Sequence, residues 1–456
     1  MNQRPTPDPS RPETPAVLDH DVVIVGAGFA GLYAAQKLGR AGVDVLLLDQ
    51  NPYHQFQPLL YQAATSQIAI STVARPLRAI LHGEREHVKI RTARVTDVDS
   101  TAKTVTTQDG LIYRARILVI AAGTEPNFFN TPGARELAYP LYSVDDATSL
   151  SSAMLGALER AAAIQEAGGE RRPFGVAVVG AGPTGVETAG AIAENIRLVV
   201  AEQYSPEFAA SINVHLIDMG KTVLPPFSQA SQKYTTRSLQ DLGIIIHLGT
   251  AVSAVTEDGV TLADDSVIPA GIVVWTAGLK ASGLLGAAGL PTGRGGRVDV
   301  RSDLTVPDFP GVYVLGDAAN IVDAKGRSLP QLGSVAKQSG QWAADNIRAE
   351  LAGQAPTPFG YRDLGFMAMI GRGHAVAEVT PRRFKINGIL AFLSWLAVHL
   401  VLLSGMQQRV AALMSWFRDY LTTSRPQVVV HQPQQYARTR QRGSTGDPAR
   451  AGVSND

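Results

Sequence analysis

Two stretches of the chain share one order of apolar and small residues. Residues 21–49 and 175–218 each begin with an unbroken run of mostly β-branched residues, pass through a glycine-rich turn and continue into an alanine-rich segment with helical spacing. Such apolar runs are typical of strands buried on both faces, as in parallel sheets. Each stretch then reaches a second apolar strand that ends in an acid, Asp49 or Asp218. The pattern predicts two βαβ units in an α/β protein.

The first glycine-rich turn contains Gly26, Gly28 and Gly31. We expect Gly26 to form the tight turn after the strand, Gly28 to let the backbone approach a pyrophosphate, and Gly31 to let the helix pack closely on the sheet. The free N–H groups of the helix start favour an anion there. Asp49 lies 18 residues beyond Gly31, in position to accept a hydrogen bond from a ribose hydroxyl. The turn therefore predicts a dinucleotide site, the alternative being a glycine-rich loop without a ligand.

The second turn repeats this arrangement at Gly180, Gly182 and Gly185. Its acid, Asp218, lies 33 residues beyond Gly185, and the longer interval has room for a helix extension and a loop. An acid at this position accepts from a free 2′-hydroxyl and repels a 2′-phosphate, which favours NADH over NADPH. Lys221 nearby is the residue that would weaken this preference. Two sites require two dinucleotides, and FAD with an exchanging nicotinamide is the usual pair.

Composition excludes several classes of function. The chain of 456 residues contains no cysteine, so disulfide frameworks, thiolate metal sites and cysteine-based redox chemistry are excluded. A net charge of +1 gives no electrostatic reason to expect nucleic-acid binding. The nine histidines show no metal-ligand spacing, so we predict no metal site. Residues 1–18 and 426–456 are rich in polar residues, proline or arginine and are expected to be disordered tails.

The region before the second tail has the pattern of a membrane anchor. Residues 389–404 form a stretch of 16 residues without a charge, which is short for a span of ~20. The next segment places one apolar stripe on a helical face, formed by Met406, Val410, Leu413, Phe417 and Leu421. Trp395 and Trp416 are of the type found at membrane interfaces. We favour two helices lying in one leaflet; a spanning helix, a homodimer interface or a soluble core are the alternatives.

Further motifs resemble those of flavoproteins with two dinucleotide domains. The strands 117–127 and 272–280 end in small residues that include Gly123 and Gly278, and Asp317 lies within the segment GVYVLGDAAN, residues 311–320. In the type II NADH:quinone oxidoreductases, similar blocks occur: YHQFQPLLYQAAT, which contains Gln57 and lines the flavin in the family; GPTGVETAGAIAE, which contains Glu187; and residues 361–379 and 387–422. The resemblance covers residues 20–425, nearly all of the expected ordered chain.

This resemblance implies FAD and NADH as cofactors, a quinone (menaquinone or ubiquinone) as the acceptor, and a peripheral, monotopic position on the cytoplasmic face of the cell membrane. It implies that Asp317 binds the flavin ribityl chain. The expected domains are a first FAD-binding part at 19–140, an NADH-binding domain at 141–292, a second FAD-binding part at 293–360 and a C-terminal membrane-anchoring domain at 361–425.

The expected catalytic residues are Glu187 and Gln338. Glu187 would relay protons to the quinone or orient the nicotinamide, the alternative being an acid placed at a helix start by the macrodipole. Gln338 matches the second glutamine of a family motif at the flavin–quinone face, but Gly333 and Ser334 replace its Ala-Gln, and Gln331 is a candidate substitute. This departure keeps open a soluble flavin reductase that uses a different acceptor. A redox-sensing flavoprotein is a separate alternative.

Overall fold

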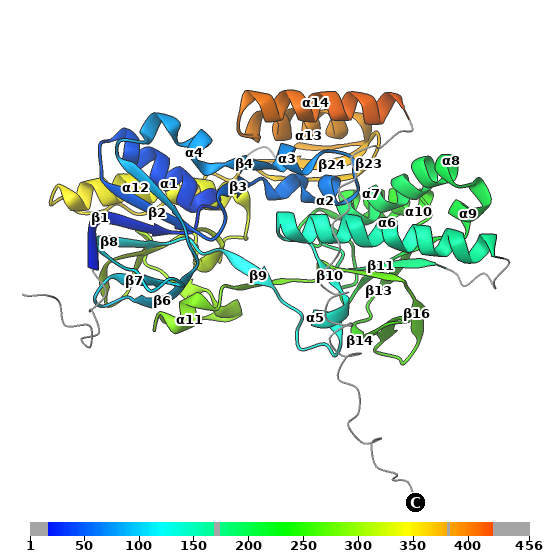
Figure 1. Cartoon of the computed structure of the whole chain (residues 1–456), viewed down its shortest axis with the longest axis horizontal. Coiled ribbons are helices and arrows are strands. Elements are labelled where there is room, and N and C mark those ends of the chain that lie inside the picture. Colours follow the sequence, from blue (N-terminus) through cyan, green and yellow to red (C-terminus); the bar gives the residue numbers. More distant parts are fainter. Residues whose placement is uncertain (1–16, 168–173, 381–383, 423–456) are drawn as a thin grey trace, which may run out of the picture. The chain divides into compact units, whose positions relative to one another are not determined.

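The computed structural model describes residues 17–167, 174–380 and 384–422 (Figure 1). The chain divides into two compact units, each built from separate stretches of sequence. Unit 1 consists of Met1–His54, Arg75–Glu125 and Leu279–Asp363, and unit 2 of Gln55–Ala74, Pro126–Gly278 and Leu364–Asp456. The chain passes between them five times. Four of the crossings lie in or next to the short strands β3 (Tyr53–Gln55), β4 (Ala74–Pro76), β9 (Thr124–Pro126) and β18 (Leu279–Ala281), and the fifth lies between Asp363 and Leu364.

Unit 1 is organised around one mixed sheet. Its central strands run in the order β21-β8-β1-β2-β5 and are parallel, and β20 and the β6–β7 hairpin add antiparallel pairs at β21 and β8. The strands are β1 (Val17–Val25), β2 (Val45–Asp49), β5 (Val88–Thr92), β6 (Val95–Asp99), β7 (Thr104–Thr107), β8 (Ile112–Ile120), β20 (Thr305–Val306) and β21 (Phe309–Val314). β1 begins at Val17, two residues before the expected start of the first domain.

Two helices of unit 1 pack tightly against each other. These are α1 (Phe29–Arg40) and α12 (Gly333–Leu351), while α4 (Leu77–Ile80) and α11 (Leu284–Ala287) are short and β19 (Val298–Asp299) pairs with β22 (Ala319–Asn320). A Cβ at Gly340 would lie 2.1 Å from the Ala30 carbonyl oxygen, so only glycine permits this approach of α12 to α1. The contact holds α12 beside the first glycine-rich turn.

Unit 2 contains a second parallel sheet, in the order β10-β17-β11-β12-β13. Its strands are β10 (Tyr139–Pro140), β11 (Gly175–Val179), β12 (Asn213–Asp218), β13 (Ile245–Leu248) and β17 (Ile272–Trp275). A smaller antiparallel sheet consists of β14 (Val252–Thr256), β15 (Gly259–Leu262) and β16 (Val267–Pro269). The helices are α2 (Leu60–Ala64), α3 (Ile70–Val73), α5 (Ala134–Leu137), α6 (Val144–Glu166), α7 (Pro183–Asn195), α8 (Ala201–Gln203), α9 (Pro206–Ala210) and α10 (Gln229–Asp241).

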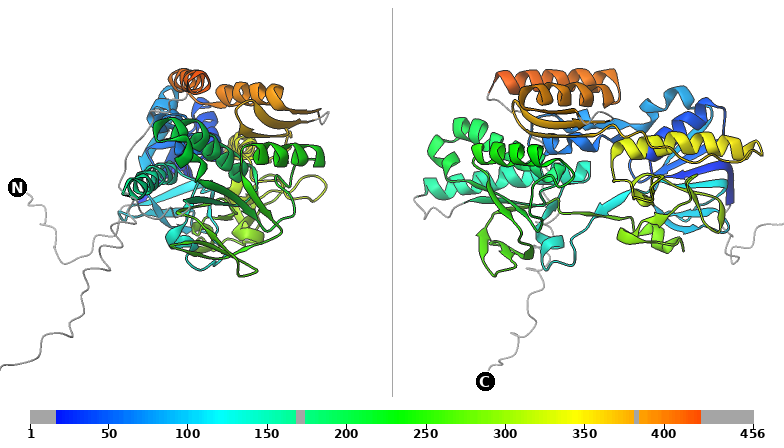
Figure 2. Two further views of the ribbon diagram at one scale, coloured as in Figure 1. Left: turned by 90° about the vertical axis from the view of Figure 1, so that its right-hand side faces the viewer. Right: turned by 180° about the vertical axis from the view of Figure 1, so that it is seen from behind.

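The C-terminal part of unit 2 is an antiparallel sheet followed by two helices. The strands are β23 (Phe366–Gly371), β24 (His374–Val379) and β25 (Phe384–Asn387), and the helices are α13 (Gly388–Leu402) and α14 (Met406–Leu421). Seen from the side, α14 lies end-on beside α13 (Figure 2). Arg409 on α14 donates from Nε to the Leu403 carbonyl at 2.9 Å and from Nη2 to the Val401 carbonyl at 2.8 Å, which satisfies the end of α13. Within the described ranges no helix combines the length and hydropathy that a membrane crossing needs.

The two tryptophans of this region do not lie where the sequence indicated. Trp395 is 0% exposed and Trp416 is 3% exposed, so neither is a surface residue of the kind that anchors at a membrane interface. Trp395 stacks on His399 with ring centroids 3.7 Å apart, and Trp416 donates from Nε1 to Gln62 Oε1 at 2.8 Å. Both indoles pack α13 and α14 onto the rest of unit 2, while the apolar stripe of α14 faces outward. The expected tail at 426–456 and most of that at 1–18 lie outside the described residues.

Candidate functional site

The first glycine-rich turn has the geometry of an anion cradle in unit 1. Gly26 has φ +100°, and a Cβ there would lie 2.3 Å from the Ala121 carbonyl oxygen. A Cβ at Gly31 would lie 1.9 Å from the Gly26 carbonyl oxygen, so α1 approaches β1 as closely as glycine allows. At Gly28, the residue before α1, a Cβ would meet nothing within 4 Å. The turn therefore leaves open space in front of the helix N-terminus, where a pyrophosphate fits.

Asp49 closes this turn from the end of β2. Its carboxylate accepts from the Ala27 N–H at 2.6 Å and from the Asn51 N–H at 2.7 Å, while burial raises its pKa. His54, which the sequence analysis did not single out, supports the same loop: its Nδ1 lies 2.9 Å from the Ala27 carbonyl oxygen, and Phe29 packs edge-on against its ring. The block YHQFQPLLYQAAT contains His54 but does not reveal this role, because the role depends on a contact with Ala27, 27 positions away.

The second turn repeats the construction in unit 2. Gly180 has φ +108°, a Cβ at Gly185 would lie 1.8 Å from the Gly180 carbonyl oxygen, and a Cβ at Gly182 would again meet nothing within 4 Å. Asp218 at the end of β12 accepts from the Ala181 N–H and from the Gly220 N–H, both at 2.6 Å. The long interval after Gly185 is filled by the rest of α7, a π-helical turn at Ile196–Val200, α8 and α9.

The two strands that end in small residues return beside these turns. β8 runs parallel to β1, and the following Ala121 is the residue that Gly26 approaches. β17 runs parallel to β11, and the backbone of Ala277 lies 2.8 Å from a Cβ built at Gly180. Gly123 has φ +66°, and a Cβ at Gly278 would lie 2.7 Å from the Phe129 ring. Each unit thus has its own dinucleotide cradle.

Asp317 supplies an independent sign of a ligand in unit 1. It follows β21 in a single 3₁₀ turn, and its Oδ1 is buried without a hydrogen-bond partner among the described residues. Burial raises the pKa of this carboxyl to about 6, and the charge of Arg297 lowers it. A buried acceptor without a donor is costly. A polyol chain such as the flavin ribityl group would supply the missing hydroxyl donor, so the residues present fit bound FAD.

The glutamines expected near the flavin have different environments. Gln338 on α12 exchanges two hydrogen bonds with the backbone of Arg362, at 2.9 and 3.0 Å. Gln331 donates to the Asp317 carbonyl oxygen at 3.1 Å, and Ser334 Oγ lies 3.0 Å from the Tyr361 hydroxyl. Gln57 is half-buried at the start of a 3₁₀ turn in unit 2. Gln338 thereby fixes the segment that leads out of unit 1. Gln331 contacts the backbone of Asp317, whose carboxylate oxygen Oδ1 has no hydrogen-bond partner among the described residues.

Glu187 lies on α7 and points toward β23 rather than capping the helix start. It is the fifth residue of α7, beyond the first turn, and its Oε1 accepts from the Met369 N–H at 3.1 Å. The explanation by the helix macrodipole is therefore wrong, because the carboxyl is engaged with a strand 182 residues away. Burial raises the pKa of Glu187 to about 8, with the Met369 amide and the nearby Trp395 indole lowering it. The indole Nε1 itself has no hydrogen bond of good geometry among the described residues.

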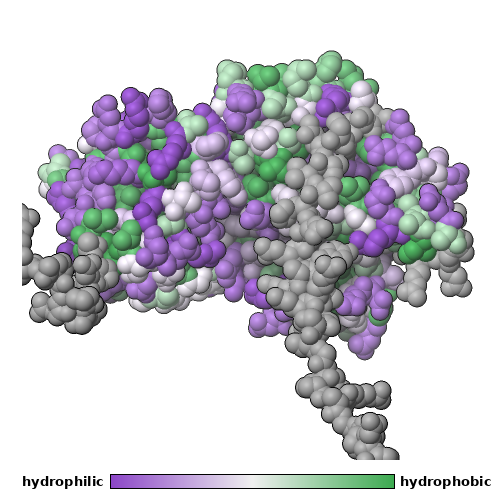
Figure 3. Space-filling view, viewed as in Figure 1, coloured by the Kyte–Doolittle hydropathy of each residue, from purple (hydrophilic) through white to green (hydrophobic). Residues whose placement is uncertain are grey.

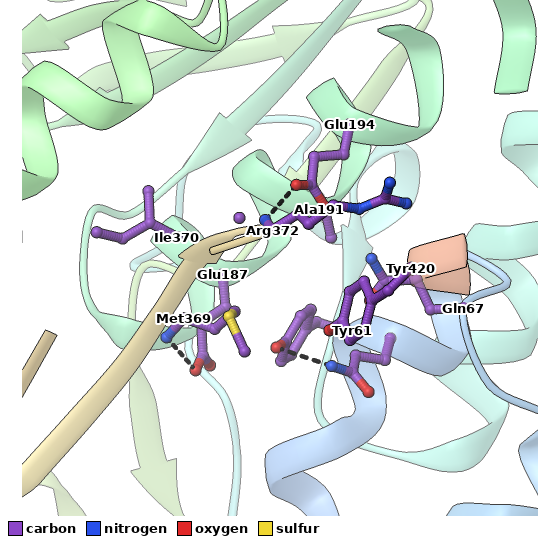
Figure 4. Close-up of a pocket in the computed structure, with 11 residues that line it drawn as sticks. Tyr61, Gln67, Glu187, Ala191, Glu194, Met369, Ile370, Arg372 and Tyr420 are labelled. Atoms are coloured by element: carbon purple, nitrogen blue, oxygen red, sulfur yellow. Dashed lines mark hydrogen bonds between the residues drawn. The ribbon is translucent and has the colours of Figure 1, made fainter. Parts of the chain in front are cut away.

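A small cavity adjoins Glu187 within unit 2 (Figure 4). Its lining includes four further ionisable or aromatic groups that the sequence analysis did not name: Tyr61, Glu194, Arg372 and Tyr420. Glu194 lies seven residues after Glu187 on an alanine-rich helix. Two acids at this spacing share one helical face, which is the signal that would have found it. Tyr61 and Arg372 carried no such signal, because only the tertiary fold brings them to α7.

Comparison with known proteins gives concordant matches. Residues 20–340 match the family model described as pyridine nucleotide-disulphide oxidoreductase. The type II NADH:quinone oxidoreductase Ndh of Mycobacterium tuberculosis is 36% identical over 452 residues, which cover 96% of this chain and 94% of that protein. NdhA of the same organism, also a type II NADH:quinone oxidoreductase, is 34% identical over 92% of this chain and 91% of that protein. The structure of NDH2 from Plasmodium falciparum in complex with NADH superimposes with a TM-score of 0.81 at 19% identity, covering 90% of this chain and 100% of that one.

Proposed function

This chain belongs to the type II NADH:quinone oxidoreductase family, and from that premise we propose that it oxidises NADH with bound FAD and reduces a quinone at a membrane surface. The family, the enzyme class and the α/β flavoprotein fold expected from the sequence are confirmed. The observation that carries the proposal is the pair of open glycine cradles, each closed by an acid.

The residues of the two cradles divide the cofactors. In unit 1, Gly26, Gly28, Gly31 and Asp49 would hold the FAD pyrophosphate and ribose, and Asp317 the ribityl chain. In unit 2, the corresponding glycines and Asp218 would hold NADH. When bound, FAD would supply the two-electron chemistry that links hydride acceptance from NADH to reduction of the quinone. The roles of Glu187 and Gln338 in this reaction stay predictions.

An exposed apolar surface supports the membrane position. We call it the apolar surface of α13 and α14; its members are Ile389, Leu390, Leu393, Val398, Val401, Leu402, Met406, Val410, Leu413, Met414, Phe417 and Leu421, each at least 41% exposed. Figure 3 shows apolar side chains gathered along these helices. A contiguous apolar surface rimmed by polar residues marks a protein or membrane contact. Because neither helix meets the criteria for a span, a monotopic contact with one leaflet is the form that we propose, on the cytoplasmic face where NADH is supplied.

Two half-reactions test the enzymatic proposal. Purified holoenzyme is reduced anaerobically with NADH while flavin absorbance is followed, and then mixed with menaquinone or ubiquinone analogues. The proposal expects bleaching by NADH and rapid recovery with at least one quinone. Bleaching followed by slow recovery with every quinone would instead favour a flavin reductase with another acceptor or a redox sensor.

Vesicle flotation tests the membrane proposal. Leu413→Gln with Phe417→Gln removes two apolar contacts of ~1.5–3 kcal/mol each, so binding to anionic phospholipid vesicles should weaken at least 100-fold. Val267→Gln, at an equally exposed apolar position of β16, is the matched control and should not change flotation. Unchanged flotation of the double variant, together with conversion of a dimer to a monomer in sedimentation, would assign the surface to a homodimer interface.

A further inference from the structure

Two carboxyl groups on α7 face the same strand of unit 2. Glu187 accepts from the Met369 N–H, and Glu194, which is 6% exposed, accepts from the Arg372 N–H. The seven-residue separation corresponds to about 10 Å along the helix. Gly190 lies between them, and a Cβ there would lie 1.8 Å from the Ile370 carbonyl oxygen. The backbones of α7 and β23 therefore touch, and the two acids flank the contact.

A cavity connects the surroundings of the two acids. It has a volume of about 10 Å³ and is lined by both carboxyl residues together with Tyr61, Ala191 and Arg372. This is room for about one water molecule. Ala191 is 3% exposed and lies between the acids on the same face of α7, so its small side chain is what leaves the space.

Tyr61 forms the side of the cavity that faces Glu187 (Figure 4). Gln62 donates from Nε2 to the Tyr61 hydroxyl at 3.2 Å, and Trp416 fixes that amide through its bond to Gln62 Oε1. Since the phenol oxygen already accepts, its own proton is directed toward another acceptor. Burial raises the pKa of Tyr61 well above its ordinary value, and the charges of Glu187, Tyr420 and Glu194 raise it further. The phenol thus stays protonated and passes a proton only by exchange.

Arg372 lines the cavity beside Glu194. It is half-buried, donates from Nη2 to the Asp419 carbonyl oxygen and stands 5.5 Å from the centre of the Tyr420 ring. Its Nε is buried and has no hydrogen-bond partner among the described residues. A water molecule in the cavity would accept a hydrogen bond from this N–H. The unpartnered donor and the volume are thus two separate indications that the cavity holds water.

We propose that Glu194 takes up a proton from solvent beside Arg372 and passes it, through water in this cavity and the Tyr61 hydroxyl, to Glu187 for delivery to the quinone. The inference rests on the proposed quinone reduction. In that reaction the hydride from NADH carries one proton and two electrons, the two quinone oxygens gain two protons, and one proton must come from solvent in each turnover. Glu194 is a relay residue, since it acts through Glu187.

Glu194→Gln tests this relay, because the amide oxygen still accepts from the Arg372 N–H but the side chain cannot load a proton. We expect flavin reduction by NADH to stay within twofold of wild type. Reoxidation by a quinone should slow by about 100-fold, the low end for lost acid–base assistance, with a larger solvent deuterium isotope effect. Reoxidation by ferricyanide, which takes electrons without protons, should be unchanged.

Two further variants separate the relay from a structural role. Ala191→Leu fills the cavity and should reproduce the slow quinone step with Glu194 intact, whereas Ala191→Ser leaves room and should not. Glu378→Gln is the matched control, because Glu378 on β24 also accepts several hydrogen bonds, from Ser228 and Ser231, but does not line the cavity.

The outcomes are distinct. If wild type is not reoxidised by any quinone, the proposed function fails. If wild type reacts with quinone but Glu194→Gln and Ala191→Leu react equally fast, the relay is refuted and the function stands. Equal slowing of the ferricyanide reaction would make Glu194 a structural residue and also overturn the relay.

Discussion

Replacement of Glu187 by Gln tests whether this carboxyl delivers the proton to the quinone. Because burial raises its pKa to about 8, about nine in ten molecules hold the proton at pH 7 and about one in ten at pH 9. Reoxidation of the reduced wild-type flavin by quinone should therefore fall about tenfold between pH 7 and pH 9. The Gln variant keeps an acceptor for the Met369 N–H but has no acidic proton, so at pH 7 it should react ~100- to 10,000-fold more slowly.

The assay is anaerobic stopped flow with the two half-reactions measured separately at each pH. In the variant, reoxidation of the flavin by quinone should be slow and should no longer depend on pH between 7 and 9. Its reoxidation by ferricyanide should match wild type. If the variant instead slows bleaching by NADH, Glu187 orients the nicotinamide. A wild-type rate of reoxidation by quinone that stays constant from pH 7 to pH 9 would contradict a Glu187 pKa of about 8 in the proton-delivery step.

Other consequences of the structure can be measured directly. Gly28→Val should abolish FAD binding, because the side chain would occupy the open space before α1, while its counterpart Gly182→Val should leave the protein yellow and block NADH; a fully flavinated Gly28→Val protein would contradict the assignment. Asp218→Ala should raise the KM for NADH about ten- to a hundredfold, the cost of a charge-assisted hydrogen bond of ~1.5–3 kcal/mol, and narrow the preference over NADPH; unchanged selectivity would point to Lys221. The raised pKa of Glu187 stabilises the fold below about pH 4.5, and this contribution is lost as pH rises through about 8. The free energy of unfolding of wild type, measured with denaturant, should therefore fall by about 2–5 kcal/mol between pH 5 and pH 9 relative to that of Glu187→Gln. If the two free energies change with pH in parallel, the Glu187 pKa is not raised by burial.

The dinucleotide cradles could be predicted from the sequence because their geometry is local. A Cβ at Gly26 or Gly31 would lie within 2.3 Å of a backbone oxygen, which no residue other than glycine tolerates. The requirement for glycine is therefore visible in a short stretch of sequence. The acids were predictable for the same reason, since each ends the strand next to its turn. Even the long interval before Asp218 did not hide it, because the parallel strand β12 returns beside β11.

The cavity beside Glu187 could not be predicted in this way. Its lining comes from α2, α7, β23 and α14, and none of the contacts among them follows from spacing. The same holds for Trp395 and Trp416: residue type indicated a membrane interface, but packing of α13 and α14 onto unit 2 buried both indoles. Amphipathic spacing identified the apolar stripe of α14, yet it did not reveal that the opposite face of the helix carries a site.

The hydrogen bond from Trp416 to Gln62 ties the inner face of α14 to α2. Truncation of the chain before α13 would therefore remove this inner contact together with the apolar outer face. The outer face of α14 is apolar, while its inner face supplies Trp416 and Tyr420 to the wall around Tyr61 and Arg372. A version cut before α13 would lose that wall and admit bulk water to the Glu187 side of α7. If the outer face binds a membrane, as we propose, polar substitutions on that face are a better route than truncation to a protein that stays in solution without detergent.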